Sequence, residues 1–281
     1  MNHNAVIIKA YAKVNLCLDI TGIADNGWHY LDTIIAPIPI FDLVKITKRE
    51  DKKISVTYDS GAMFLNDVAY KMAKIIQDTY DTSGVDIFIN KVIPVASGIG
   101  GSSADAAAVA IGMRKLFSLC DIDSTILMKA GSDIPAMYKG GITRVRGFGE
   151  KVGTVSLPKS LYVSLLIDET VQLKTEDIYK MYDSIGGAHG LVDDYLKNLK
   201  PFNSLEKTAI SINSNVKRLN NLLSMAGFEY VVMTGSGSGV IGYALDEKKH
   251  LDVVKNLEGL LVGKKTSHYK FKIDKDGFIR D

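Results

Sequence analysis

The stretch at 93–112, IPVASGIGGSSADAAAVAIG, changes abruptly from flexible loop residues to a run of helix formers. Three glycines and three serines fall between Ser97 and Ser103, and alanines dominate the residues after Ser103. Glycines let backbone N–H groups approach an anion closely, and a helix N-terminus adds about half a positive charge. Serine hydroxyls can add donors to a phosphate or ligands to Mg²⁺. The stretch predicts a phosphate-binding loop, with a plain glycine-rich turn into a helix as the alternative.

The start of this helix is predicted from its polar residues. Ser102 is followed three residues later by Asp105, a loose form of the capping-box pattern. We therefore expect the helix to begin near Ser102 or Ser103 and to reach about Leu119. No GxxxxGK[ST] sequence occurs in the chain, which excludes a Walker A loop.

A second glycine-rich turn, TGSGSG at 234–239, lies near the end of the chain. The residues from Gly237 to Gly242 match the GxGxxG spacing of dinucleotide-binding loops. That fingerprint needs a helix after the turn, and VIGYAL at 240–245 predicts a strand instead. We therefore expect a tight turn between two strands that can close over a substrate.

The composition is that of a globular protein of one large or two smaller domains. The 281 residues are 46% hydrophobic and 23% charged, and the net charge of +2 gives no basic field for nucleic acid. Two cysteines are too few for a disulfide framework, which favours a reducing compartment. The longest charge-free stretches, 230–245 and 92–104, are too short to span a bilayer. These features predict a cytoplasmic protein without a membrane or nucleic-acid partner.

Strand and helix patterns alternate irregularly, which favours an α+β fold over a doubly wound parallel sheet. Pro37 and Pro39 interrupt an apolar, β-branched stretch at 33–46 and predict an edge strand or a bent pair of strands. Asn66 and Thr175 are the expected caps of two further helices. The expected strands lie at 6–20, 33–46, 54–58, 85–89, 162–168, 230–235 and 240–245, with a hairpin at 141–157 and helices mainly at 66–76, 102–119, 124–130, 175–182 and 187–227.

Three polar residues invite a chemical role, although each also has a structural interpretation. Lys13 interrupts an apolar strand, AYAKVNL, where it can face solvent or a reacting group. Asp133 in GSDIPA can cap a helix or accept a proton. His29 follows Trp28, and a lone histidine is more often structural than a ligand. The remaining histidines show no metal-ligand spacing, so no metal site of the protein's own is predicted.

Taken together, the motifs resemble those of the GHMP kinases, small-molecule kinases without a Walker A loop. The family pattern is matched in order by AKVNL (12–16), IPVASGIGGSS (93–103) and TGSGSG (234–239). Further segments are similar to the members that act on a cytidine-diphosphate compound, namely NGWH (26–29), GSDIP (131–135), GGITRVRGFGE (140–150) and FNSLE (202–206).

The resemblance implies a fold and a reaction. The fold is the two-domain GHMP kinase fold, with an N-terminal domain at 1–153 similar to domain 2 of ribosomal protein S5 and a C-terminal ferredoxin-like α/β sandwich at 154–281. The reaction is ATP-dependent phosphorylation of the 2-hydroxyl of a methylerythritol joined through a diphosphate to cytidine, with Mg²⁺ accompanying ATP. A monomer or weak homodimer is expected. The same fold without catalysis would give a nucleotide-binding protein, and retention of Lys13 and Asp133 favours the kinase.

The resemblance also implies residue roles. Asp133 matches the aspartate that accepts the hydroxyl proton, and Lys13 matches the lysine beside it, whose ammonium keeps the aspartate ionised. The ATP phosphates are assigned to Pro94, Val95, Ala96, Ser97, Gly98, Ile99, Gly100, Gly101, Ser102, Ser103 and Ala104, and adenine to Asn66. Asn15, Trp28, His29 and Tyr179 match contacts of the cytosine end, and Thr175 matches a further substrate contact.

Two positions depart from the family pattern. Trp28 stands where tyrosine or phenylalanine is usual, and Ser102 stands where glycine is usual. A positive φ at Ser102 would strain the loop by roughly 1–2 kcal/mol, and a shift of the helix start by one residue would avoid that strain.

Overall fold

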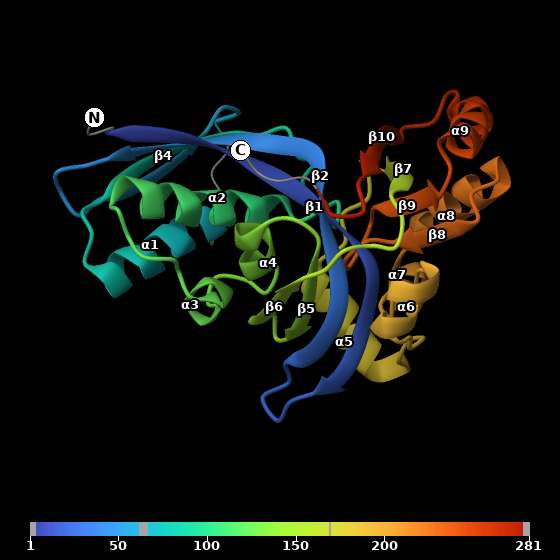
Figure 1. Ribbon diagram of the computed structural model, residues 1–281, viewed down its shortest axis with the longest axis horizontal. Helices are drawn as coiled ribbons and strands as arrows, with labels where there is room; N and C mark the ends of the chain where they lie inside the picture. The colour runs from blue at the N-terminus through green and yellow to red at the C-terminus, as the bar shows by residue number, and fades with distance from the viewer. Residues whose placement is uncertain (1–3, 62–66, 169, 278–281) are drawn as a thin grey trace.

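A computed structural model of the protein describes residues 4–61, 67–168 and 170–277. Two sheets form its centre (Figure 1). The first has the order β3-β4-β2-β5-β6, with β1 also paired to β2, and only β3 and β4 run parallel. Its strands are β1 (Ala5–Ile23), β2 (His29–Lys48), β3 (Ile54–Tyr58), β4 (Val85–Asn90), β5 (Thr143–Gly147) and β6 (Lys151–Thr154).

One face of the first sheet is covered by helices α1 (Val68–Tyr80), α2 (Gly101–Leu116), α3 (Ser124–Met128) and α4 (Ile134–Lys139) (Figure 1). Helix α2 is buried nearly all round, because its small alanine side chains allow close packing against β1, β2 and α1 at once. The alanine run of the sequence is therefore the central helix of this layer.

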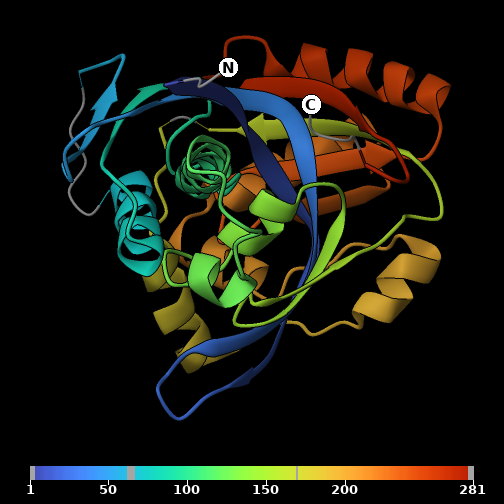
Figure 2. The same ribbon diagram turned by 60° about the vertical axis from the view of Figure 1, so that its left-hand side comes forward.

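Strands β1 and β2 are long, with 19 and 20 residues, and they bend together along their length (Figure 2). The predicted edge strand or bent pair over 33–46 is wrong, since β2 is one continuous strand inside the sheet. Pro37 and Pro39 are tolerated because they lie between the part of β2 that pairs with β5, at 31–35, and the part that pairs with β4, at 43–48. Strand β2 has no second neighbour there that would need their missing N–H groups.

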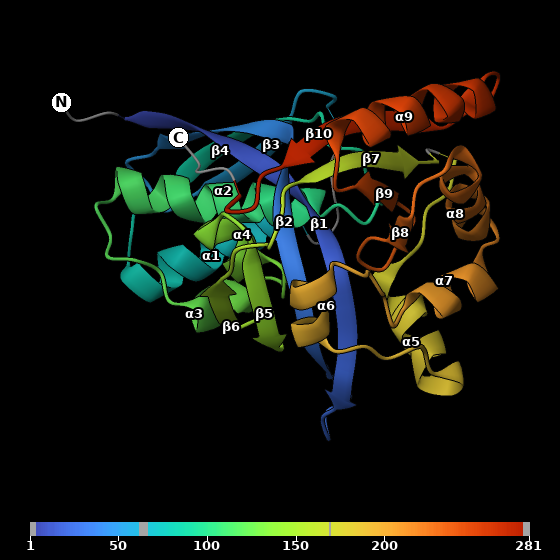
Figure 3. The same ribbon diagram turned by 45° about the vertical axis from the view of Figure 1, so that its right-hand side comes forward.

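The second sheet has the antiparallel order β10-β7-β9-β8. Helices α8 and α9 pack against it (Figure 3). The chain order strand–helices–strand–strand–helix–strand with this sheet order is that of a ferredoxin-like sandwich. The elements are β7 (Leu161–Ile167), α5 (Thr175–Ile185), α6 (Val192–Asn198), α7 (Glu206–Ile212), α8 (Asn215–Ala226), β8 (Tyr230–Met233), β9 (Val240–Ala244), α9 (Glu247–Leu261) and β10 (Ser267–Ile273).

These observations confirm the predicted α+β class. The strands of the first sheet end with β6 and those of the second begin with β7, while residues of both sheets, such as Leu16 and Val163, share one hydrophobic core. The division into domains at 153 and 154 stays a prediction.

Three expected helix caps are wrong. Helix α2 is capped by Gly100, which takes the left-handed φ of 75°, so it begins one residue before Ser102 and ends at Leu116. The cap of α1 is Asp67, whose carboxylate accepts two backbone N–H bonds, and Asn66 lies outside the described residues. Helix α5 is preceded by Lys174, because the hydroxyl of Thr175 is bonded to Ser236 instead of capping the helix.

Candidate active site

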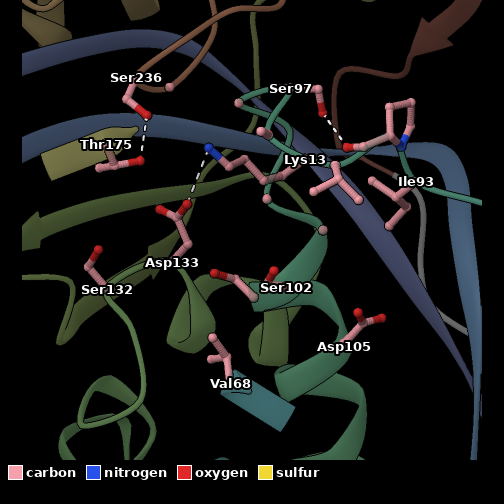
Figure 4. A pocket seen from close by; sticks show the side chains of 18 of the residues that line it. Lys13, Val68, Ile93, Ser97, Ser102, Asp105, Ser132, Asp133, Thr175 and Ser236 are labelled. Carbon is pink, nitrogen blue, oxygen red and sulfur yellow. Dashed lines mark hydrogen bonds and ion pairs between the residues drawn. The ribbon is translucent and has the colours of Figure 1, made fainter. Parts of the chain in front are cut away.

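The two glycine-rich loops meet at a pocket of about 400 Å³. Strand β1, the loop before α2, the start of α4 and the turn between β8 and β9 all contribute to its wall (Figure 4). The sequence-predicted residues that line it are Lys13, Asn15, Pro94, Val95, Ala96, Ser97, Gly98, Gly100, Gly101, Ser102, Ser103, Asp133, Thr175 and Tyr179. Ile99 and Ala104 are buried in the core behind the loop.

Lys13 and Asp133 form an ion pair in this pocket, with 3.2 Å between Nζ and Oδ2 (Figure 4). Lys13 is only 4% exposed, which rules out the solvent-facing alternative. Its ammonium also donates to Asn15 Oδ1 at 2.7 Å. The Asp133 carboxylate makes no capping bond to α4, although the residue stands at the start of that helix. The carboxylate therefore faces a cation and the pocket rather than the helix end.

An irregularity in β1 gives Lys13 its position. The pairing with β2 shifts register between Tyr11 and Lys13, and Lys13 lies opposite Pro37. The Lys13 N–H donates to Ile99 O at 2.9 Å, so the strand backbone holds the glycine-rich loop directly. A Cβ on Gly100 would lie 2.9 Å from Lys13 Cε, which explains why glycine is needed where the lysine stem crosses the loop.

The loop itself alternates backbone conformations before it enters α2. Ala96, Gly98 and Gly100 have φ of 54°, 76° and 75°, whereas Ser102 lies inside the helix with no positive φ. The expected strain at Ser102 is therefore absent, because the helix begins one residue earlier than Ser102. Together with Ser103, it belongs to the first turn, whose backbone N–H groups lack partners within the helix and suit an anion.

The turn at 234–239 packs on the first loop. Gly239 N donates to Ser97 O at 3.0 Å, and a Cβ on Gly98 would come within 2.6 Å of Gly237 O. Across the pocket, the hydroxyls of Ser236 and Thr175 are 2.8 Å apart (Figure 4). The two loops thus form one continuous surface of the pocket. Closure of the second turn over a substrate stays a prediction.

His29 and Trp28 do not line the pocket, although His29 is close to Tyr179, which does. His29 Nε2 pairs with Asp183 Oδ1 at 2.6 Å, and the His29 ring is 4.7 Å from that of Tyr179. Burial raises the pKa of Tyr179, and the nearby charge of Asp133 adds to the effect. Trp28 is 54% exposed, with its ring edge-on to Phe148 at 6.0 Å. The structure brings His29 and Tyr179 together, while Trp28 packs on Phe148 and does not line the pocket.

A buried charge cluster was missed by the sequence interpretation. Lys91 Nζ lies 2.5 Å from Asp42 Oδ2 and 2.8 Å from Asp105 Oδ2, and both Lys91 and Asp105 line the pocket. Burial raises the pKa of Asp105 to about 7, opposed by Lys91 and assisted by Asp42. The signal available was an acidic residue inside an alanine helix, which was interpreted as part of a cap. Asp42 lies far away in sequence and gave no signal.

Comparison with known proteins agrees with this geometry. The family model "GHMP kinases N terminal domain" matches residues 67–143. A crystal structure of 4-(cytidine 5'-diphospho)-2C-methyl-D-erythritol kinase superposes with a TM-score of 0.75 at 24% identity, covering 95% of this chain and 98% of that one. A homoserine kinase from Cytophaga hutchinsonii superposes with a TM-score of 0.72 at 13% identity, covering 99% and 97%. The fold and the pocket define a GHMP kinase, and the predicted two-domain GHMP kinase fold is confirmed.

Sequence relatives narrow this class. The 4-diphosphocytidyl-2-C-methyl-D-erythritol kinase of Bacillus subtilis (strain 168) is 31% identical over 272 residues, covering 90% of this chain and 93% of the relative. That of Macrococcus caseolyticus is 32% identical over 274 residues, covering 89% and 94%. The chain belongs to the 4-diphosphocytidyl-2-C-methyl-D-erythritol kinase family.

Proposed function

We propose that this enzyme transfers the γ-phosphoryl group of ATP to the 2-hydroxyl of 4-diphosphocytidyl-2-C-methyl-D-erythritol, a step of non-mevalonate isoprenoid precursor biosynthesis. The names of the sequence relatives support the substrate. The observation that carries the chemistry is the ion pair at 3.2 Å between the buried Lys13 and the partly exposed Asp133, beside a glycine-rich loop that leads into a helix.

Asp133 and Lys13 have complementary roles in this proposal. The substrate hydroxyl gives its proton to the Asp133 carboxylate as its oxygen bonds to the γ-phosphorus, and the bond from that phosphorus to the bridging oxygen of ADP breaks. The Lys13 ammonium keeps the carboxylate ionised and stabilises negative charge on the attacking oxygen. Asn15 holds that ammonium in place through its side-chain oxygen.

The first loop is assigned to the phosphates of ATP. Its residues 94–104 include the backbone N–H groups at the start of α2, and Ser102 and Ser103 supply hydroxyls. Mg²⁺ bound with a nucleotide needs few protein ligands, and the hydroxyls of Ser102 and Ser103 in this pocket suit such a cation. When bound, Mg²⁺ would neutralise phosphate charge. The assignment of adenine to Asn66 falls outside the described residues.

The cytidine end is assigned to the wall formed by β1, β2 and α5. Asn15 and His29 provide polar contacts, while Tyr179 and Trp28 provide aromatic faces for the base. Aromatic stacking on a base is worth roughly 1–3 kcal/mol. Thr175, bonded to Ser236, is assigned to a further substrate contact. The exposed position of Trp28 supports a base that enters from the outer side.

The setting of the enzyme is also part of the proposal. No helix among the described residues is long and apolar enough to cross a bilayer. Cys17 and Cys120 are both free thiols, which supports a reducing, cytoplasmic compartment. We propose a monomer or weak homodimer with domains at 1–153 and 154–281.

A coupled assay of ADP release tests the function. Purified protein with Mg·ATP is expected to turn over on addition of 4-diphosphocytidyl-2-C-methyl-D-erythritol. Mevalonate and homoserine serve as controls, because GHMP kinases with other acceptors share this fold. Turnover with either control and none with the cytidine compound would contradict the proposed substrate. ATP binding without any turnover would indicate a nucleotide-binding protein instead.

A further inference from the structure

The segment FNSLE at 202–206 has no part in the chemistry above, yet its side chains hold the second glycine-rich loop. Asn203 is buried, and its Nδ2 donates to Met233 O at 2.8 Å and to Gly235 O at 2.9 Å. Its Oδ1 accepts from Leu205 N at 2.9 Å, which fixes the orientation of the amide. One side chain therefore fixes two carbonyls at the start of the loop.

The same segment is fastened to β1, the strand that carries Lys13. Leu18 N donates to Phe202 O and Ser204 N donates to Leu18 O, both at 2.9 Å, in a parallel bridge. Farther along β1, Asn15 N donates to Thr234 Oγ1 at 2.8 Å. The loop is thus linked to β1 at two separated points, once directly and once through Asn203.

Glu206 holds the same part of the chain through the Met233 N–H group. Its Oε2 accepts from Met233 N at 2.9 Å, and its Oε1 accepts from Asn220 Nδ2. Both the N–H and the C=O of Met233 are therefore bonded to side chains of this one segment. Burial raises the pKa of the partly buried Glu206 carboxyl, and the bonds from Met233 N and Asn220 Nδ2 oppose that shift by stabilising the charged form.

The loop held in this way touches the reacting groups. A Cβ on Gly235 would lie 3.1 Å from Lys13 Nζ and 2.8 Å from Gly98 O. A small displacement of the loop backbone at Gly235 would therefore move or crowd the lysine and the phosphate loop together. Phosphoryl transfer depends chiefly on positioning, so such a displacement affects the rate.

We propose that Asn203 and Glu206 are positioning residues for phosphoryl transfer, which act by holding Met233 and Gly235 so that Lys13 stays aligned with Asp133. The inference rests on the proposed kinase function, because it assigns a role within that reaction.

The variant Asn203→Ala tests the proposal against the matched control Gln77→Ala. Gln77 is also buried and donates through Nε2 to a backbone carbonyl, that of Lys52, at 3.0 Å, and it does not line the pocket. At a temperature where both variants are folded, Asn203→Ala is expected to lower kcat at least tenfold, with KM for the cytidine substrate within threefold. Gln77→Ala is expected to keep kcat within twofold. Equal effects on kcat would overturn the proposal.

A double-mutant cycle shows whether Asn203 acts through Lys13. In a Lys13→Ala background, Asn203→Ala is expected to lower the single-turnover rate by less than a further twofold. If Asn203→Ala lowers the rate in this background as much as it does in the wild type, the proposed action of Asn203 through Lys13 is overturned. Glu206→Leu keeps a side chain of similar size, removes both oxygens that accept from Met233 N and Asn220 Nδ2, and is expected to lower kcat at least threefold. This variant decides the matter if Asn203→Ala does not fold, and an unchanged kcat would overturn the proposal.

Hydrogen exchange of the loop separates this proposal from the proposed function. In the unliganded protein, Asn203→Ala is expected to speed exchange of the Gly237 and Gly239 amides at least tenfold, and Gln77→Ala is not. If the exchange rates of these amides are unchanged, Asn203 does not hold the loop, and the proposal is overturned even if the wild type is active. Absence of turnover by the wild type would contradict the kinase function, while the exchange result would still decide whether Asn203 holds the loop.

Discussion

The two glycine-rich loops border the same pocket, but their conformations arise in different ways. The loop before α2 takes its conformation mainly from its own residues, with positive φ at Ala96, Gly98 and Gly100 and a helix directly after them. Distant groups among the described residues reach it only through backbone bonds to Ser97 O and Ile99 O. The turn between β8 and β9 is held from a distance, by Asn15 on β1 and by Asn203 and Glu206 before β8. A locally encoded loop can be predicted from sequence, whereas a loop held by distant side chains needs the fold.

The largest expected effect comes from substituting Asp133, which lines the pocket between the two loops. Asp133→Ala should lower kcat by at least about 10³-fold, because it removes the only assigned proton acceptor, while ATP affinity should stay within about tenfold. Steady-state kinetics and ATP titration measure the two effects. Turnover close to that of the wild type would show that the loops position some other group.

A methyl group placed between the loops should disturb both of them. Gly98→Ala adds a Cβ at 2.6 Å from Gly237 O and 2.7 Å from Thr234 O, at a residue with positive φ. The conformation alone costs roughly 1–2 kcal/mol, and we expect a KM for ATP raised at least tenfold. Gly259→Ala is the matched control, since its Cβ meets nothing within 4 Å in α9, and it should stabilise the protein by about 0.5–1 kcal/mol. Equal ATP kinetics in the two variants would show that the loops do not need this close approach.

The aromatic wall outside the loops should affect only one substrate. Trp28→Ala should raise KM for the cytidine substrate roughly 5- to 150-fold, in line with the loss of one stacking partner, and should leave KM for ATP within twofold. Leu251→Ala, which removes an exposed apolar side chain from α9, should change neither. Equal changes in both KM values would remove Trp28 from the base site.

The smallest effect on activity is expected from a substitution of His268 in β10, an edge strand of the second sheet. Burial lowers the pKa of His268 to about 4, assisted by Lys270 and His250 and opposed by Glu258. The unfolded chain therefore binds more protons than the folded protein between pH 6.5 and 4, so stability falls as the pH drops through that range. The loss is at most about 3 kcal/mol.

Urea unfolding at several pH values measures this loss. His268→Asn should flatten the pH dependence and should leave kcat at pH 8 within twofold, because His268 contacts Ser164 and neither loop. A large fall in kcat would show that the second sheet influences the loops although His268 contacts neither of them.

The sequence predicted most of what is local in this molecule. Period-two and helical patterns located most of the elements, and glycines with serines located the phosphate loop. The failures have physical causes. Pro37 and Pro39 suggested an edge because pairing partners of β2 cannot be known before the sheet is formed. The cap at Ser102 was wrong because Gly100 takes the left-handed conformation and begins the helix earlier.

The site was predictable as motifs but not as a network. Lys13 and Asp133 are 120 residues apart in sequence, and only the resemblance to GHMP kinases put them together before the structure showed 3.2 Å between them. Asp42 and Lys91 could not be paired from the sequence, because an ion pair between residues far apart in the chain has no characteristic sequence spacing. The FNSLE segment was recognisable as a motif, while its grip on Met233 and Gly235 became visible only in three dimensions.

The central claim is that the Lys13–Asp133 pair transfers the γ-phosphoryl group of ATP to a cytidine-linked alcohol. Incubation with γ-labelled ATP and 4-diphosphocytidyl-2-C-methyl-D-erythritol, followed by separation of the products, tests it directly. The label should appear in the cytidine compound with the wild type and should remain in ATP with Asp133→Ala. Label that stays in ATP with the wild type, or reaches only inorganic phosphate, would contradict the claim.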